Sequence, residues 1–155
     1  MKNSDAILQV LKNTAFRNLW IGQVCTSLAV SVTMFVLALR IYQLTGSSTA
    51  VSALYLAFGV PAFLFAMASG AIVDHFDKRT ILILADIARA VVAGLFLFAF
   101  GKIAIVYVLA FLYAFITQFA TPSEAPTIPR LVEPKDLVGA NSLYSFTFYS
   151  SLAIG

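Results

Sequence analysis

The chain has 155 residues, of which 61% are hydrophobic and only 11% are charged, and its formal net charge is +3. A soluble domain is about one quarter charged, so this composition excludes a water-soluble globular fold and indicates an integral membrane protein. The basic residues are scattered at the ends of apolar stretches, which fits membrane topology better than a surface for nucleic acid.

The scarcity of reactive residue types argues against an enzyme. One cysteine and one histidine occur in the sequence, so no disulfide can form within the chain and no metal site is visible. We find no nucleophile paired with a base and no glycine-rich loop of the phosphate-binding kind. We therefore expect no catalytic activity, no metal and no cofactor.

Five apolar stretches are long enough to cross a bilayer, which takes roughly 20 residues in a helix. In chain order they cover residues 19–39, 50–73, 80–100, 103–121 and 137–155. These stretches are continuously apolar, whereas the strands of membrane barrels alternate apolar and polar residues over roughly ten positions. Because backbone groups in lipid must be paired internally, we predict five transmembrane α-helices in an all-α membrane protein.

The segments between the apolar stretches contain residues that break helices. Gly46 lies between the first two stretches, and Gly101 lies between the third and the fourth. Residues 122–136 hold four of the five prolines and are predicted to form a broken segment at the membrane surface. Residues 1–18 are predicted to be an N-terminal segment in which residues 5–12 form a short interfacial helix.

The orientation follows from the unequal distribution of lysine and arginine. One side receives seven of them, namely Lys2, Lys12, Arg17, Lys78, Arg79, Arg130 and Lys135. The other side receives only Arg40 and Lys102. Positive residues gather on the cytoplasmic side, so we predict a multi-pass protein of the plasma membrane with a cytoplasmic N-terminus.

The second apolar stretch carries a stripe of small residues that ends in an acid. Ala62, Ala66 and Gly70 are spaced by four, which lets another helix approach closely. Asp74 continues the stripe one turn later, at the predicted cytoplasmic end. Asp77 has the spacing of an N-cap residue for the third helix.

The sequence GAIVDHFDKR, residues 70–79, resembles the signature loop between the second and third helices of the major facilitator superfamily, roughly G-x-x-x-D-[RK]-x-G-[RK]-[RK]. The matching residues are Gly70, Asp74, Lys78 and Arg79. His75 replaces a basic residue of the signature, and Asp77 replaces a glycine. Residues 16–23 and 122–143 resemble further pieces of the branch that contains macrolide, multidrug and siderophore exporters, so the resemblance covers essentially the whole chain.

The resemblance implies a twelve-helix fold in two halves, each with inverted three-helix repeats and with the substrate near the midplane between the halves. Residues 1–155 would then be an incomplete N-terminal half, and the remaining helices of the same transporter would be its partners. The resemblance also implies that Asp74 is a gate latch, which contacts basic groups of the other half when the cytoplasmic side is shut. The alternative is that the charges of the corner only set the topology.

Asp86 and Arg89 lie inside the third apolar stretch and are three residues apart, so they can pair on one helix face. A charge inside the membrane is costly and usually has a partner or a function. Arg89 either reaches toward Asp74 and couples the gate to the helices, or forms a local pair with Asp86. The resemblance places both residues in the gating set, because related exporters often carry Asp-x-x-Arg here.

Polar side chains recur at helical spacing inside three other stretches. They are Gln23, Ser27 and Ser31 in the first, Tyr113, Thr117 and Gln118 in the fourth, and Asn141, Tyr144, Ser145 and Tyr149 in the fifth. The resemblance implies that the first and fourth helices line the substrate cavity. The alternative is hydrogen bonding between helices, worth roughly 1 kcal/mol or less per bond.

The expected function is secondary transport by alternating access, with efflux of small amphipathic or drug-like molecules. The interiors of these three stretches contain no Asp, Glu or His, which leaves open whether the transporter is a proton antiporter. The expected partners are the lipid bilayer and a small-molecule substrate, without nucleic acid. The alternatives are a truncated, non-transporting membrane protein or helix-binding scaffold, and a transporter whose cargo is a lysolipid or a siderophore.

Overall fold

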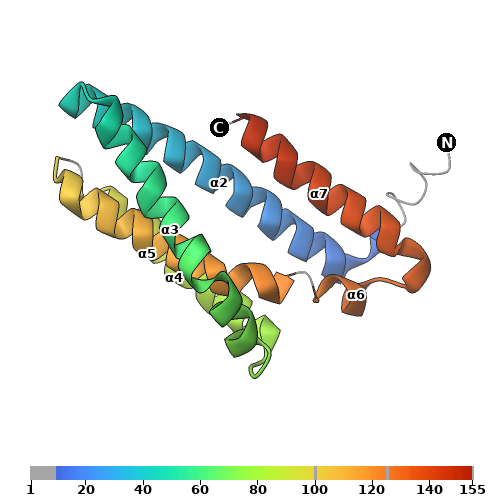
Figure 1. The fold of residues 1–155 in the computed structure, drawn as a ribbon. Helices are drawn as coiled ribbons and strands as arrows, with labels where there is room; N and C mark the ends of the chain where they lie inside the picture. Colours follow the sequence, from blue (N-terminus) through green and yellow to red (C-terminus); the bar gives the residue numbers. More distant parts are fainter. Residues whose placement is uncertain (1–9, 100, 125, 155) are drawn as a thin grey trace. The chain divides into compact units, whose positions relative to one another are not determined.

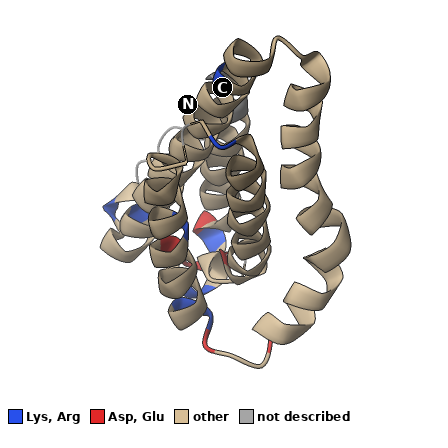
Figure 2. Cartoon of the chain, turned by 90° about the vertical axis from the view of Figure 1, so that its left-hand side faces the viewer, with Lys and Arg blue, Asp and Glu red and all other residues tan. Residues whose placement is uncertain are grey.

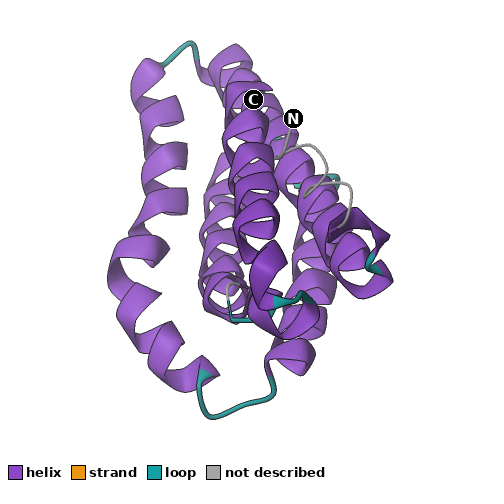
Figure 3. Ribbon diagram, turned by 90° about the vertical axis from the view of Figure 1, so that its right-hand side faces the viewer, coloured by secondary structure: helices purple, strands orange, loops and turns teal. Residues whose placement is uncertain are grey.

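The computed structural model describes residues 10–99, 101–124 and 126–154, and this part of the chain contains helices and no strand (Figure 3). The long helices are α2 (Thr14–Thr45), α3 (Ser48–Val73), α4 (Lys78–Phe96), α5 (Ile103–Glu124) and α7 (Leu137–Ile154) (Figure 1). Two short elements, α6 (Ile128–Leu131) and the 3-10 helix η1 (Pro134–Asp136), precede α7. The expected all-helical class is confirmed for these residues.

Three of the helices, α2, α3 and α5, are long and apolar enough to cross a membrane. The other two long helices are more polar, because α4 carries four charged residues and α7 carries many hydroxyl groups. Figure 2 shows long stretches of helix without any charged residue. The structure thus supports a membrane protein, and the crossing of the bilayer by α4 and α7 stays a prediction.

The described residues divide into two compact units, and the boundary falls within α2 after Phe35. The first unit contains the longer, N-terminal part of α2 together with α6, η1 and α7. The second unit contains the last turns of α2 together with α3, α4 and α5.

In the first unit, α2 and α7 lie side by side (Figure 1). Gln23 donates to the carbonyl of Tyr144 at 3.5 Å, and Ser31 donates to the carbonyl of Ser151 at 2.9 Å. The partners advance along both helices in the same direction, so α2 and α7 run parallel. Hydrogen bonds between helices are a common means of association in lipid, where burial of apolar surface gives no driving force.

The proline segment closes one end of this unit. It is broken into α6 and η1, as predicted, although Pro122 is still accommodated within α5. A buried cluster joins it to the two long helices and consists of Val10, Phe16, Ile128, Val132 and Ala140. The interfacial helix predicted for residues 5–12 falls mostly outside the described residues, and only residues 10–12 can be seen to be helical.

In the second unit, α5 packs against both α3 and α4. Aromatic rings fill the contact with α3, where Phe65 meets Phe115 edge-on at 4.9 Å and Phe58 stacks on Tyr113 at 5.8 Å. Offset and edge-on ring pairs of this kind stabilise packing beyond the area that they bury. The helix therefore lies at the centre of the unit, with its buried face shared by two neighbours.

Two glycines make the tight connections that the sequence predicts. Gly46 follows α2 with a φ of 62°, and Gly101 precedes α5 with a φ of 99°. Only glycine adopts such backbone angles without steric cost. Ser47 then caps α3, because its side chain accepts a hydrogen bond from the backbone of Ala50 at 3.4 Å.

Candidate gate and substrate surface

The corner between α3 and α4 is organised by Asp77. Its carboxylate accepts hydrogen bonds from the backbone N–H of Thr80 at 3.0 Å and from the Thr80 hydroxyl at 2.8 Å. The predicted N-cap of the third apolar stretch is therefore confirmed. The hydroxyl and backbone donors of Thr80, in this order, lower the pKa of Asp77 because they stabilise the charged form.

Asp77 stands where the superfamily signature has glycine, yet the turn does not require one. The backbone of Asp77 has a φ of −68° and a ψ of 115°, which any residue adopts. His75 also has a local role, since its Nδ1 lies 2.9 Å from the carbonyl oxygen of Ala71. The two departures from the signature are thus compatible with a well-formed corner.

Asp74 ends α3 and forms an ion pair with Lys78, with 3.2 Å between Oδ1 and Nζ. The two side chains differ in exposure, which is 71% for Asp74 and 18% for Lys78. Most of the Asp74 carboxylate is therefore open to a further partner. An exposed ion pair of this spacing contributes little to stability. Stability alone therefore does not explain why an acidic residue stands at position 74.

The small residues that lead to Asp74 have no close neighbour in the described part of the chain. Ala62 and Ala66 are exposed, and a side-chain carbon added at Gly70 would meet no atom within 4 Å. The packed face of α3 is instead the one that carries Pro61 and Ser69. The close approach of another helix to this stripe stays a prediction.

Arg89 pairs with Asp86 on the same helix. Of the two alternatives for Arg89, the structure therefore contains the local pair. The alternative contact between Arg89 and Asp74 is not formed, because Asp74 pairs with Lys78. The guanidinium lies on the face of α4 that packs on α5, and Arg89 is only 6% exposed, while the Asp86 side chain is 55% exposed. The Arg89 Nε is buried and has no hydrogen-bond partner among the described residues.

The polar residues of α5 turn largely inward. Tyr113 is buried and stacks on Phe58 of α3. The Thr117 hydroxyl donates to the carbonyl of Tyr113 at 2.9 Å, within the same helix. Gln118 likewise donates within α5, to the carbonyl of Ala114 at 3.2 Å. Within the described residues, these groups serve the helix itself and the packing around it.

The polar stripe of α2 faces α7. Ser31 and Gln23 donate to backbone carbonyls of α7, and Ser27 lies half-buried between them. Trp20 adds a further bond along the same contact, because its indole N–H donates to the Thr147 hydroxyl at 3.0 Å. Gln23 is 8% exposed, and its Oε1 has no partner among the described residues.

The polar residues predicted on α7 lie on two different faces. Tyr144 is half-buried and packs against the cluster at the end of α2. Asn141, Ser145 and Tyr149 are exposed, and Tyr149 keeps 69% of its surface accessible. The four residues therefore do not form one surface.

Asn13 has a structural role that was not predicted from the sequence. Its Oδ1 accepts hydrogen bonds from the backbone of Ala15 at 3.0 Å and of Phe16 at 3.3 Å, which caps α2. Its Nδ2 donates to the carbonyl of Leu131, so the same side chain ties α2 to the proline segment. The cap could have been found from an asparagine before an apolar run, but the distant partner could not.

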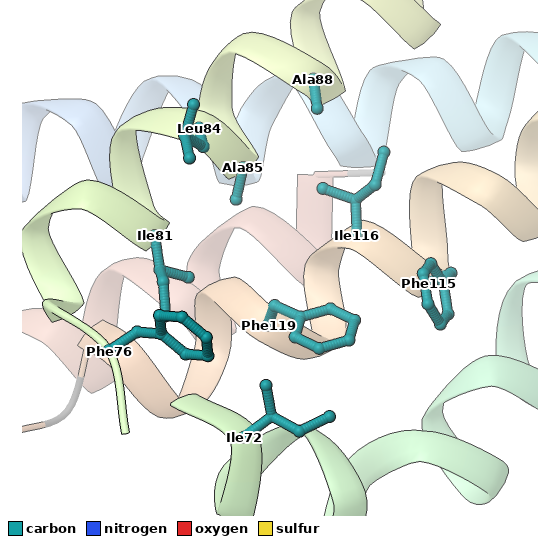
Figure 4. Close-up of a pocket in the computed structure, with 9 residues that line it drawn as sticks. All are labelled: Ile72, Phe76, Ile81, Leu84, Ala85, Ala88, Phe115, Ile116 and Phe119. Atoms are coloured by element: carbon teal, nitrogen blue, oxygen red, sulfur yellow. The ribbon is translucent and has the colours of Figure 1, made fainter. Parts of the chain in front are cut away.

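An open groove of about 370 Å³ lies in the second unit, near the corner (Figure 4). Its walls are Ile72 and Phe76 beside the end of α3, the face of α4 between Ile81 and Ala88, and Phe119 with its neighbours on α5. The lining is entirely apolar, so the groove offers no group that would orient a polar ligand.

No group of three or more His, Cys, Asp or Glu in the described ranges could hold a metal ion.

Comparison with known proteins places the chain in a family. Searches of curated proteins and of solved structures each found no significant match. The family described as Major Facilitator Superfamily matches residues 19–155, which supports a multi-pass membrane transporter and agrees with the expectation that the chain is not an enzyme. The chain belongs to the Major Facilitator Superfamily.

Proposed function

We propose that the protein is a secondary transporter of the plasma membrane that exports small amphipathic molecules by alternating access. The family match over residues 19–155 is the observation that carries this proposal. The long apolar helices α2, α3 and α5 support it, because they supply the membrane-spanning frame that a transporter needs. The direction of transport and the drug-like cargo rest on the resemblance to exporters.

In this proposal α4 and α7 also cross the bilayer, and the five helices belong to a twelve-helix fold with the N-terminus in the cytoplasm. The excess of lysine and arginine on one side supports that orientation. The corner of residues 70–79 then lies at the cytoplasmic surface and acts as the gate, with the exposed carboxylate of Asp74 as its latch. The substrate passes between the two six-helix halves of that fold, near the membrane midplane.

Everted membrane vesicles test the function directly. We expect vesicles that contain the full-length protein to accumulate the amphipathic dye ethidium faster than vesicles from the same cells without it. Repeating the assay with and without a pH gradient then tests whether protons drive transport. No accumulation above the control would contradict export of such molecules and favour a non-transporting membrane protein that binds a partner helix.

A further inference from the structure

A small polar pocket of about 250 Å³ lies in the first unit, at the end where α2 and α7 begin (Figure 1). One wall is the short stretch before α2, with Lys12 and Asn13, and the other wall is the segment that leads through η1 into α7. The pocket is smaller than those that enclose drug-sized ligands, which measure about 300–1,000 Å³. It therefore suits a small polar group. We refer to it as the proline-segment pocket.

The walls of the proline-segment pocket are fixed by the fold. Val10 and Val132, one from each wall, are buried in the cluster that joins the proline segment to the two long helices. Asn13 connects the walls a second time, since its Nδ2 donates to the carbonyl of Leu131. A pocket whose walls are already held in place loses little conformational freedom on binding, and this favours affinity.

The pocket contains charges of both signs, and one pair of them is already satisfied. Glu133 and Lys135 form an ion pair of 2.8 Å at the rim, where both side chains are largely exposed. The hydrogen bond and the charge of Glu133, followed by the charge of Asp136, raise the pKa of Lys135. Because Glu133 is the main partner of Lys135, these two residues need no ligand.

Lys12 and Asp136 are the two charges that remain. In the described part of the chain, neither forms an ion pair with the other or with a third residue. Both line the same pocket, in which Lys12 is exposed and Asp136 is half-buried. A ligand that bears one negative and one positive group can therefore form a charge-assisted hydrogen bond with each of them.

The position of the pocket relative to the membrane selects the kind of ligand. The helices α2 and α7 run parallel, and the pocket lies just before the first residue of each. If both helices cross the bilayer, the pocket lies at the membrane surface, which is cytoplasmic in the proposed orientation. Lipid headgroups are concentrated at this depth, and basic side chains there bind lipid phosphates.

We propose that the proline-segment pocket binds the headgroup of a phosphatidylethanolamine molecule, with Lys12 on the phosphate and Asp136 on the ammonium. The proposal rests on the proposed membrane topology but not on transport activity. Phosphatidylethanolamine carries both charges, and its primary ammonium has N–H groups that donate to a carboxylate. Phosphatidylcholine has a quaternary ammonium without N–H groups, and phosphatidylglycerol has no ammonium, so neither lipid can donate from a cation to Asp136.

Lipid binding to the purified full-length protein tests the proposal without a transport assay. Native mass spectrometry counts the bound lipids as phosphatidylethanolamine, phosphatidylcholine or phosphatidylglycerol is added to the detergent solution, and the counts give a Kd for each lipid. The variants are Lys12→Gln and Asp136→Asn. Lys102→Gln is the matched control, because Lys102 is an exposed lysine outside the first unit. The ratio of two Kd values within one variant does not depend on the amount of folded protein.

We expect the natural protein and Lys102→Gln to bind phosphatidylethanolamine about tenfold more tightly than phosphatidylcholine. Asp136→Asn should lose this preference and keep its affinity for phosphatidylglycerol, whereas Lys12→Gln should bind phosphatidylethanolamine and phosphatidylglycerol about tenfold more weakly. Equal affinities of the natural protein for phosphatidylethanolamine and phosphatidylcholine would overturn the proposal, as would an affinity of Lys12→Gln for phosphatidylethanolamine that matches Lys102→Gln. Displacement of the bound lipid by an equal concentration of water-soluble phosphoethanolamine would also overturn it, because the ligand would then be a free solute.

Discussion

At the scale of single residues, the N-cap formed by Asp77 makes the stability of the corner depend on pH. Its pKa is lowered in the folded protein, so its cap contributes fully above the ordinary aspartate pKa and is lost as the pH falls through the lowered folded value. We expect Asp77→Ala to lower the thermal stability at neutral pH and to abolish this acid-dependent part of the stability. Asp77→Asn should keep a cap without the pH dependence. Melting curves recorded from neutral pH to below the aspartate pKa measure the loss of stability and its dependence on pH. Equal acid sensitivity of the natural protein, Asp77→Ala and Asp77→Asn would contradict the role of Asp77 as a pH-dependent cap.

The pair of Asp86 and Arg89 predicts that either single loss is costly and that the double loss is less so. Asp86→Ala leaves a buried cation without its partner, which costs about 3 kcal/mol of unfolding free energy. Arg89→Met leaves an acid without its partner inside the predicted span, so we expect a loss of stability there as well. The double variant should regain most of the stability lost in Asp86→Ala, because no uncompensated charge stays buried. Unfolding in mixed micelles with a denaturing detergent measures the three values, and a double variant no better than Asp86→Ala would refute the explanation.

Local spacing decided which of these residue contacts could be predicted. The cap by Asp77 and the pair of Asp86 and Arg89 each join residues three positions apart, and helix geometry alone brings such residues together. The alternative contact between Arg89 and Asp74 is not formed in the structure, where Lys78, one turn from Asp74, is the nearer cation. The unpartnered Nε of Arg89 depends on packing with α5, which no local pattern encodes.

At the scale of the elements, Asn13 joins α2 to the proline segment through two groups of one side chain. Asn13→Asp keeps the oxygen that caps α2 and removes the N–H₂ that donates to Leu131. Asn13→Ala removes both groups, and loss of the cap alone costs about 1 kcal/mol. We therefore expect stability to fall from the natural protein to Asn13→Asp and further to Asn13→Ala. Equal stability of the two variants in the same unfolding assay would show that the bond to Leu131 contributes nothing.

The helices themselves follow closely from the apolar stretches, since a bilayer-spanning segment must pair its backbone internally. The face that each helix turns to its neighbours was harder to predict. The stripe of Gln23, Ser27 and Ser31 suits a water-filled cavity and a helix contact equally well, and only the position of α7 distinguishes them. On α7 we predicted one polar set that contained both Tyr144 and Ser145, although adjacent residues on a helix point about 100° apart.

At the scale of the whole molecule, the exposed carboxylate of Asp74 is the feature that connects the corner to transport. If it latches the cytoplasmic side to other helices, its bond to Lys78 uses only part of its capacity, and neutralising it weakens the closed state. We expect Asp74→Asn to slow ethidium accumulation in everted vesicles while the amount of protein in the membrane stays unchanged. Glu133→Gln is the matched control, because Glu133 is also an exposed acid that pairs with a lysine, Lys135 at 2.8 Å. We expect vesicles with Glu133→Gln to accumulate ethidium at the rate of the natural protein. If vesicles with Asp74→Asn also show that rate, the role of Asp74 is only to end a helix.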